Sequence, residues 1–194
     1  NSLEFKSLLR SVKELKLSSY VNKIYILSYD KKIATLSGAE WIDRNKLIFN
    51  NDNMNAEKLL SISLKEIEST DFYPGVILYV NHHYPFRPKN LFNDLIIKLQ
   101  YMGLSSVFPC FVDYGHYWMK TNKGFSQIDS SMDSRTSREP IMRALYGLGC
   151  ASSSVDIREG NITGNNVGII SIDNYKFTLN LREIGSPEII KTLI

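Results

Sequence analysis

The residues best suited to chemistry stand together in the segment NHHYPFR, residues 81–87. Asn81 and His82 offer hydrogen-bonding side chains, and Arg87 offers a planar fork of donors that matches a phosphate or carboxylate group. A predicted helix follows, and helix N-termini favour anions. The alternative is that Pro85 makes a rigid turn and Arg87 caps a neighbouring carbonyl group. Of the two, the position of the segment at the end of a predicted strand favours a loop that binds a ligand.

The spacing of the histidines and cysteines does not favour a metal site. His82 and His83 are adjacent, and adjacent side chains of an extended segment point to opposite faces. His116 lies far along the chain, and no H-x-x-x-H spacing occurs. Cys110 and Cys150 also lack metal-ligand spacing, which predicts buried thiols in a reducing compartment such as the cytoplasm.

A second group of cations lies in the run RTSREP, which contains Arg135 and Arg138. Two guanidinium groups this close could clamp a phosphate, although a solvated loop is an equally good interpretation. The sequence contains no Walker A, G-x-G-x-x-G or G-x-S-x-G motif. Standard nucleotide-loop and hydrolase signatures therefore give no assignment.

The rest of the chain, which holds these residues in place, alternates between predicted helices and strands. Apolar residues recur at helical spacing over residues 3–16, 56–67 and 90–102, and short, continuous apolar runs between them predict buried strands. This alternation predicts an α/β fold: a mostly parallel sheet with helices on both faces. Residues 81–87 then lie beyond the carboxyl end of a strand, where such sheets bind ligands. The apolar face of the third helix consists of Leu91, Phe92, Leu95, Ile96 and Leu99.

Beyond Asp113 the pattern changes to polar, turn-rich sequence with strands in succession. The runs YWMK, LYGLGCASSSV, NVGIISID and FTLNL predict a small antiparallel or mixed extension. A helix from about Ser186 closes the chain. The length and composition are those of one globular domain, so we expect one domain over residues 1–194.

Composition narrows the class of partner. The chain has 194 residues, 43% hydrophobic, with a formal charge of +3 and both signs interspersed. That charge is too small for a phosphate-tracking protein, so no nucleic-acid partner is expected, and an anionic small substrate suits it. No apolar run is long enough to span a membrane. The sequence begins at Asn1 without a methionine, which suggests that something before it was removed or left out.

Taken in order, several motifs resemble those of the N-acylneuraminate cytidylyltransferases, the CMP-sialic acid synthetases and their relatives. The strand VNKIYILSYD, ending at Asp30, is similar to the family's Ser-Thr-Asp strand, and GAEWIDR, ending at Arg44, is similar to its Gly-Ala strand. NHHYPFR looks like the family's Gln-Pro-Thr-Ser-Pro-Leu-Arg, with Asn81 in place of glutamine. The segment with Tyr146 and the closing strands complete the likeness, which covers nearly the whole chain.

The resemblance implies a Rossmann-like nucleotidyltransferase fold and transfer of CMP from CTP to an acidic sugar in surface polysaccharide or glycoconjugate synthesis. It implies that Arg44 and Asn81 line the pocket beside His82, with Arg87 and Arg138 in support. It also implies Mg²⁺ on the phosphates, and a homodimer formed through an insertion at residues 113–143.

The sequence departs from the family's motifs at two places, and these departures raise alternative functions. The signature loop Arg-x-Gly-Ser-Lys-Arg has no counterpart, although Asp52 matches an acid ahead of a helix. The family's Asp-x-Asp pair falls on Asn180 and Arg182, so Asn180 with Asp173, or with Glu183, would have to serve the metal. The alternative function is a non-catalytic binding or partner module of the same fold. A glycosyltransferase would need an early Asp-x-Asp loop, which is not present.

Overall fold

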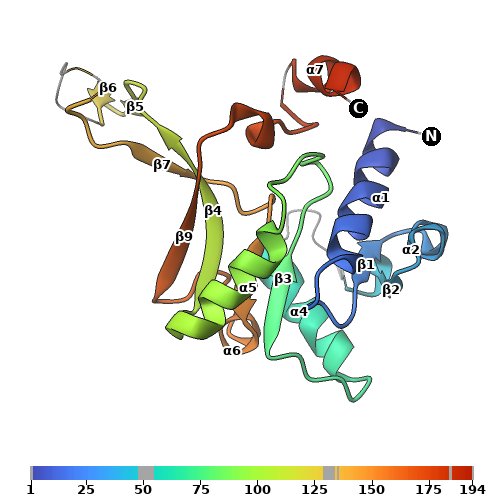
Figure 1. The fold of residues 1–194 in the computed structure, drawn as a ribbon. Coiled ribbons are helices and arrows are strands. Elements are labelled where there is room, and N and C mark those ends of the chain that lie inside the picture. The colour runs from blue at the N-terminus through green and yellow to red at the C-terminus, as the bar shows by residue number, and fades with distance from the viewer. Residues whose placement is uncertain (1, 48–54, 129–133, 135, 184, 194) are drawn as a thin grey trace.

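The fold was described from a computed structural model, which covers residues 2–47, 55–128, 134, 136–183 and 185–193 (Figure 1). Helices and strands alternate up to β4, as the sequence predicts. The helices are α1 (Leu3–Lys16), α2 (Lys31–Ser37), α3 (Arg44–Leu47), α4 (Ala56–Glu68), α5 (Leu91–Met102), α6 (Ser154–Arg158) and α7 (Ser186–Leu193). The strands are β1 (Tyr25–Ser28), β2 (Glu40–Asp43), β3 (Val76–Tyr79), β4 (Ser106–Asp113), β5 (Trp118–Thr121), β6 (Gly124–Gln127), β7 (Ile141–Ala144), β8 (Cys150–Ser153) and β9 (Val167–Ile172).

The largest sheet is not mostly parallel, so that part of the prediction is wrong. It has five strands, and β8 lies antiparallel between β3 and β4, while β7 pairs antiparallel with the other half of β4. Only the β4–β9 pairing is parallel. Strands β7 and β8 run in the same direction, one after the other along β4. Between β4 and β7 the described residues form the β5–β6 hairpin and no crossover helix, and a strand that returns without a crossover runs antiparallel.

The strand directions still place the carboxyl ends of β3, β4 and β9 at the same end of the sheet. Because β3 and β4 both run antiparallel to β8, they run parallel to each other, and β9 runs with β4. The loop after β3 and the segment after β9 therefore emerge at the same end, the top of Figure 1. The predicted late strand FTLNL is a 3₁₀ helix (Tyr175–Thr178) and a turn, so that strand prediction is wrong.

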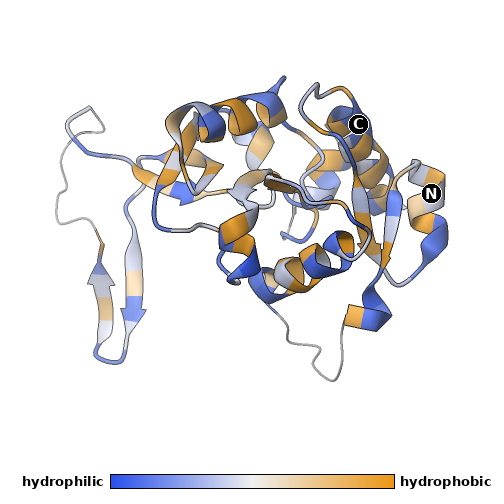
Figure 2. Ribbon diagram, turned by 90° about the horizontal axis from the view of Figure 1, so that it is seen from below, coloured by the Kyte–Doolittle hydropathy of each residue, from blue (hydrophilic) through white to orange (hydrophobic). Residues whose placement is uncertain are grey.

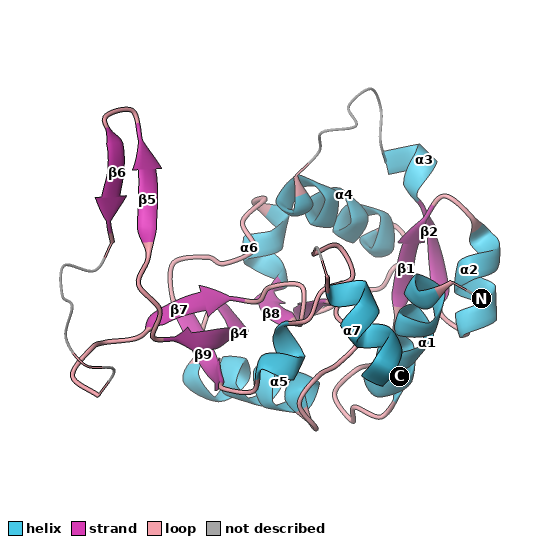
Figure 3. Cartoon of the chain, turned by 90° about the horizontal axis from the view of Figure 1, so that it is seen from above, coloured by secondary structure: helices cyan, strands magenta, loops and turns pink. Residues whose placement is uncertain are grey.

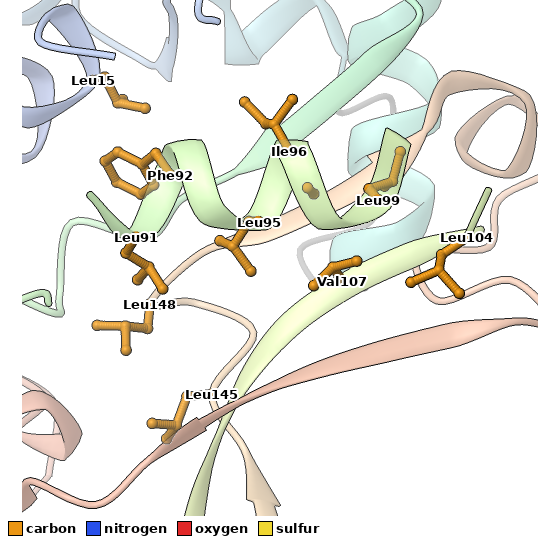
Figure 4. Packing of buried hydrophobic residues seen from close by; sticks show 11 residues of the cluster. Leu15, Leu91, Phe92, Leu95, Ile96, Leu99, Leu104, Val107, Leu145 and Leu148 are labelled. Atoms are coloured by element: carbon orange, nitrogen blue, oxygen red, sulfur yellow. The ribbon is translucent and has the colours of Figure 1, made fainter. Parts of the chain in front are cut away.

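Helices cover both faces of this sheet, as predicted. On one face α5 packs against β4 and β8, and all five of its predicted core residues are buried (Figure 4). On the opposite face Leu64 of α4 and Ile157 of α6 pack against Phe108 and the two cysteines. Cys110 and Cys150 are free and buried, as expected, since thiols pack well in an apolar interior.

A separate parallel pair, β1 and β2, forms the second sheet. Helix α1 joins the two sheets because it contributes Val12 to the cluster over β1 and Leu15 to the cluster over β3. Ser2 caps this helix, its side chain accepting a hydrogen bond from the amide of Phe5. Among the described residues β1 pairs only with β2, and β3 only with β8, so each strand keeps one open edge.

The hairpin of β5 and β6 stands away from the rest of the chain (Figures 2 and 3). Its residues are largely exposed, including Trp118, Met119 and Phe125. At the other side of the molecule α7 returns to α1, where Ile190 packs with Phe86 and Leu3. None of the helices in the described ranges combines the length and the hydrophobicity that a bilayer span requires.

Candidate functional site

Residues 81–88, which we call the 81–88 loop, are held in place at the carboxyl end of β3. The amide of Asn81 donates to the Gly147 carbonyl oxygen at 2.8 Å, and its side-chain oxygen accepts from the His83 amide at 2.9 Å. Gly147 belongs to the 145–149 turn between β7 and β8. A Cβ atom at Gly147 would lie 2.7 Å from the Tyr84 ring and 3.0 Å from the Asn81 Cβ, so only glycine allows this approach.

Arg87, predicted to serve the ligand, is buried inside the protein, with its side chain 1% exposed. Nε donates to the Leu148 carbonyl oxygen at 2.8 Å, Nη1 to the Ser11 hydroxyl at 2.9 Å and Nη2 to the Asn81 carbonyl oxygen at 3.0 Å. Burial lowers the pKa of Arg87 to about 10, and the carboxylate of Glu14 opposes that shift. The guanidinium therefore stays charged at neutral pH and binds the chain's own groups, and its supporting role at the pocket stays a prediction.

Helix α1 meets this loop with polar side chains that the sequence reading missed. Ser7 is fully buried and its hydroxyl donates to the His82 carbonyl oxygen, while Ser11 accepts from Arg87 and donates to the Ser7 carbonyl oxygen at 2.9 Å. Glu14 lies 3.7 Å from Arg87 Nη1. Serines four residues apart on the buried face of an amphipathic helix were the available signal.

The two histidines do not point to opposite faces, because the chain turns at residues 82–83 instead of continuing as a strand. Their rings pack edge to face with centroids 4.1 Å apart. His83 is 3% exposed, its Nδ1 has no hydrogen-bond partner, and burial, the neighbouring His82 and the charge of Arg182 lower its pKa to about 4. Burial also lowers the pKa of His82. Both rings are therefore neutral at neutral pH.

Arg44 lies at the end of β2, in the other sheet from Asn81. Its guanidinium sits over the Tyr29 ring, with Cζ 5.0 Å from the centroid, and its buried Nε has no acceptor. An unpaired buried donor is costly, which makes this group suited to receive an anion. Asp43 beside it accepts from the amide of Asn45 at 3.0 Å. The matched acid Asp52 lies outside the described residues.

Arg138 lies at the base of the β5–β6 hairpin, away from the 81–88 loop along the chain. Its Nη1 lies 3.0 Å from Nδ1 and 2.9 Å from Nε2 of His116. Because a guanidinium can only donate, the ring nitrogen that it reaches must be unprotonated. Arg135 lies outside the described residues, so the proposed pair of arginines stays a prediction.

The residues predicted for Mg²⁺ do not fit a resident metal site. The side-chain oxygen of Asn180 accepts from the amide of Arg182 at 2.9 Å, which closes a turn, and the amide of Glu183 donates to the Asn180 carbonyl oxygen at 3.0 Å. Asp173 is exposed. In the described part of the chain, no three His, Cys, Asp or Glu residues form a group that could hold a metal ion.

The arrangement thus brings Asn81, His82 and Arg87 together in one loop, with Arg87 beneath it. The loop is covered from above by the C-terminal segment, since the amide of Leu181 donates to the His83 carbonyl oxygen at 2.9 Å. The side-chain oxygen of Asn81 is used inside the loop, so its amide group is the donor that remains for a ligand. This geometry suits recognition of a polar molecule by a fixed hydrogen-bonding surface.

Comparison with known proteins shows which fold this is. No protein-family model and no curated protein matches the sequence. Solved structures do match. One is a CMP:2-keto-3-deoxy-manno-octonic acid synthetase complexed with CTP, with a TM-score of 0.62 and 8% identity over 96% of this chain and 85% of that one. The chain shares the fold of this cytidylyltransferase.

Two further structures support the same statement. The 4-diphosphocytidyl-2C-methyl-D-erythritol synthase of Anaerococcus prevotii matches with a TM-score of 0.61 and 10% identity, over 96% of this chain and 85% of its own. The 2-C-methyl-D-erythritol 4-phosphate cytidylyltransferase of Thermus thermophilus matches with a TM-score of 0.56 and 8% identity, over 96% and 88%. The nucleotidyltransferase fold expected from the sequence is thus confirmed.

Proposed function

We propose that the protein binds a cytidine nucleotide at the carboxyl ends of its strands and transfers CMP to an acidic sugar of the sialic-acid class. Such a reaction serves the synthesis of surface polysaccharides or glycoconjugates. The observation that carries the proposal is the placement of the 81–88 loop. It fixes Asn81 at the strand end of a fold that is shared with a CTP-bound synthetase.

In the proposed reaction the anomeric hydroxyl oxygen of the sugar forms a bond to the α-phosphorus of CTP. The bond between that phosphorus and the bridging oxygen breaks, pyrophosphate leaves with the electron pair, and the hydroxyl proton passes to solvent. The Asn81 amide would hold a polar edge of the ligand, and the unpaired Nε of Arg44 would face a phosphate. His82 would remain a neutral hydrogen-bonding group, since its pKa is lowered.

The chain itself supplies no metal cluster in its described part, so we assign no step to a bound ion. Mg²⁺ is expected to arrive with the phosphates of the nucleotide, which are its preferred ligands together with one or two carboxylates. Arg138 would support the site from the base of the hairpin.

A second function is favoured by one observation. Asn180 and Arg182 close a turn through the Asn180 side chain where the related enzymes are expected to carry a carboxylate pair. A protein with this turn that keeps the nucleotide pocket would bind without catalysis and act as a partner module.

The exposed hairpin supports a homodimer as the assembly. Trp118 and Phe125 lie on one face of the ribbon, because Trp118 pairs with Gln127 and Lys120 pairs with Phe125. A two-stranded ribbon is only marginally stable alone in water, so apolar side chains on it favour contact with a second copy.

Calorimetric titration with CTP, with and without Mg²⁺, followed by a pyrophosphate-release assay with acidic sugars, tests the proposal. We expect binding that weakens about tenfold or more in Asn81→Ala, because a ligand hydrogen bond is lost. Arg158→Met, far from this loop, should bind as the unmodified chain does. Binding without product would favour the partner module, and no binding of CTP would overturn the proposal.

A further inference from the structure

Arg87 joins three segments that are distant in sequence. Its three nitrogens donate to the Ser11 hydroxyl on α1, to the Leu148 carbonyl oxygen in the 145–149 turn and to the Asn81 carbonyl oxygen in its own loop. The guanidinium also lies over the Phe92 ring of α5, with Cζ 5.5 Å from the centroid. Every nitrogen is therefore committed, and each bond reaches a different part of the structure.

Helix α1 supplies the matching surface. Ser7, Ser11 and Glu14 follow the spacing i, i+4, i+7 and so share one face of the helix. Ser7 donates to the His82 carbonyl oxygen, and Ser11 and Glu14 meet Arg87. Serine side chains are short, which lets the backbone of the loop approach the helix closely. We call these three residues the polar stripe of α1.

A polar stripe fixes position in a way that an apolar face does not. Apolar side chains tolerate sliding, because burial is non-directional, whereas hydrogen bonds fail once their atoms separate by about an ångström. A shift of α1 by one helical turn, roughly 5.4 Å, would break its bonds to both His82 and Arg87. The loop must therefore follow α1 or lose its bonds.

We propose that Arg87 is a positioning residue that couples α1 to Asn81. Through the polar stripe, the placement of α1 sets the position of the Asn81 backbone, and with it the direction of the Asn81 amide group. The coupling itself depends only on the contacts described here. Its effect on ligand binding rests on the proposed nucleotide function.

The 145–149 turn makes the coupling tighter. Asn81 donates to Gly147 while Arg87 donates to Leu148, so the loop touches neighbouring carbonyl groups of one turn at two points. The third point is Ser11. Contacts at these three points fix the orientation of the loop. Residues 81–87 therefore have little freedom to tilt relative to α1 and the 145–149 turn.

Amide hydrogen exchange tests the coupling without a ligand. In Arg87→Met and in Ser11→Ala, the amides of Asn81, His83 and Tyr84 should exchange at least tenfold faster, while those of the β4–β9 ladder keep their rates. Ser11→Ala is the milder change because it removes only one hydrogen bond of Arg87. It therefore still tests the proposal if Arg87→Met does not fold. Unchanged exchange at these three amides in Ser11→Ala, or an equal rise throughout the protein, would overturn the coupling.

A matched arginine separates positioning from general stabilisation. Arg158 ties α6 to α4 through two bonds to Glu68 Oε1, at 2.9 and 2.6 Å, remote from the loop. Arg158→Met should leave exchange at Asn81, His83 and Tyr84 unchanged. If it speeds them as much as Ser11→Ala does, the effect is general and the proposal fails.

CTP titration then connects the coupling to the site. We expect Ser11→Ala to weaken CTP binding several-fold and Arg87→Lys, which keeps the charge but not the fork, to weaken it at least as much. If the unmodified chain binds no CTP, the nucleotide function fails while the exchange result still decides the coupling. If CTP binds and Ser11→Ala binds equally well despite faster exchange, the role at the site is wrong.

Discussion

The 81–88 loop and the β5–β6 hairpin both follow strands of the main sheet, and both were candidates for a site. The loop is tied down: Arg87 is buried, and Asn81 is bonded to the neighbouring turn. The hairpin is the opposite, with Trp118 60% and Phe125 73% exposed.

The difference separates two uses of a loop. The 81–88 loop places its polar groups with internal bonds before any ligand arrives, and such preorganisation lowers the cost of recognition. The hairpin presents apolar surface that the described part of the chain leaves uncovered, which is the property of a contact surface. Changes in the loop should therefore affect the fold, and changes in the hairpin should affect association.

The largest expected effect is that of Arg87→Met on stability. The change leaves the Leu148 and Asn81 carbonyl oxygens and the Ser11 hydroxyl without their donor, at a cost of about 3–5 kcal/mol in the free energy of unfolding. Urea denaturation measures it, and Arg158→Met, at an exposed ion pair, should cost much less. If both variants lost the same free energy of unfolding, the buried arginine would contribute no more to stability than the exposed one, and the prediction would be wrong.

The next effect is the dependence of stability on pH through His83. Its pKa is about 4 in the folded protein against 6.5 normally, so the unfolded chain binds its proton first as the pH falls. The stability that comes from keeping His83 neutral is fully present above pH 6.5. Between pH 6.5 and pH 4 it is lost, which lowers the free energy of unfolding by about 2–3 kcal/mol.

His83→Gln removes this titration, so its free energy of unfolding should fall less than that of the unmodified chain between pH 7 and pH 4.5. Denaturation at both pH values gives the difference, in which the other titrating groups cancel. Parallel losses in the two proteins would show that His83 is not neutral and buried.

A smaller effect is expected for Gly147→Ala, at the contact between the loop and the turn. The added methyl group must displace the Tyr84 ring, which should cost about 1–2 kcal/mol. Gly75→Ala is the matched control, because a Cβ atom there meets nothing within 4 Å. Thermal unfolding of the two variants compares them, and a stability of Gly147→Ala equal to that of Gly75→Ala would contradict the close approach.

The smallest effect on folding belongs to the hairpin. Changing Trp118 and Phe125 together to serine should alter the free energy of unfolding of the monomer by less than about 0.5 kcal/mol, since both side chains are exposed. The same change should abolish the homodimer in sedimentation analysis. Tyr101→Ser, at a side chain 90% exposed on α5, should leave association intact. Persistence of the dimer in the serine variant would rule out the hairpin as its contact.

Helices and strands whose apolar residues recur at a regular spacing could be predicted from the sequence. The candidate site could be predicted only in part. The apolar face of α5 was correct to the residue, because helical periodicity reports burial directly. The antiparallel placement of β8 was missed, because strand direction depends on how the chain reconnects after β4, which periodicity does not record. The polar stripe of α1 was missed for a related reason. Ser7 and Ser11 interrupt an apolar face, and only the structure shows what they meet.

The open edges of β1 and β3 have a consequence for handling the protein. In the described part of the chain each edge presents backbone donors and acceptors without a partner strand, and such an edge is a template on which a foreign extended segment can continue the ladder. We therefore expect clouding on warming to begin from strand addition at these edges. Light scattering would then rise at the same temperature for the unmodified chain and for the hairpin double variant. A later onset in the variant would assign the clouding to the hairpin.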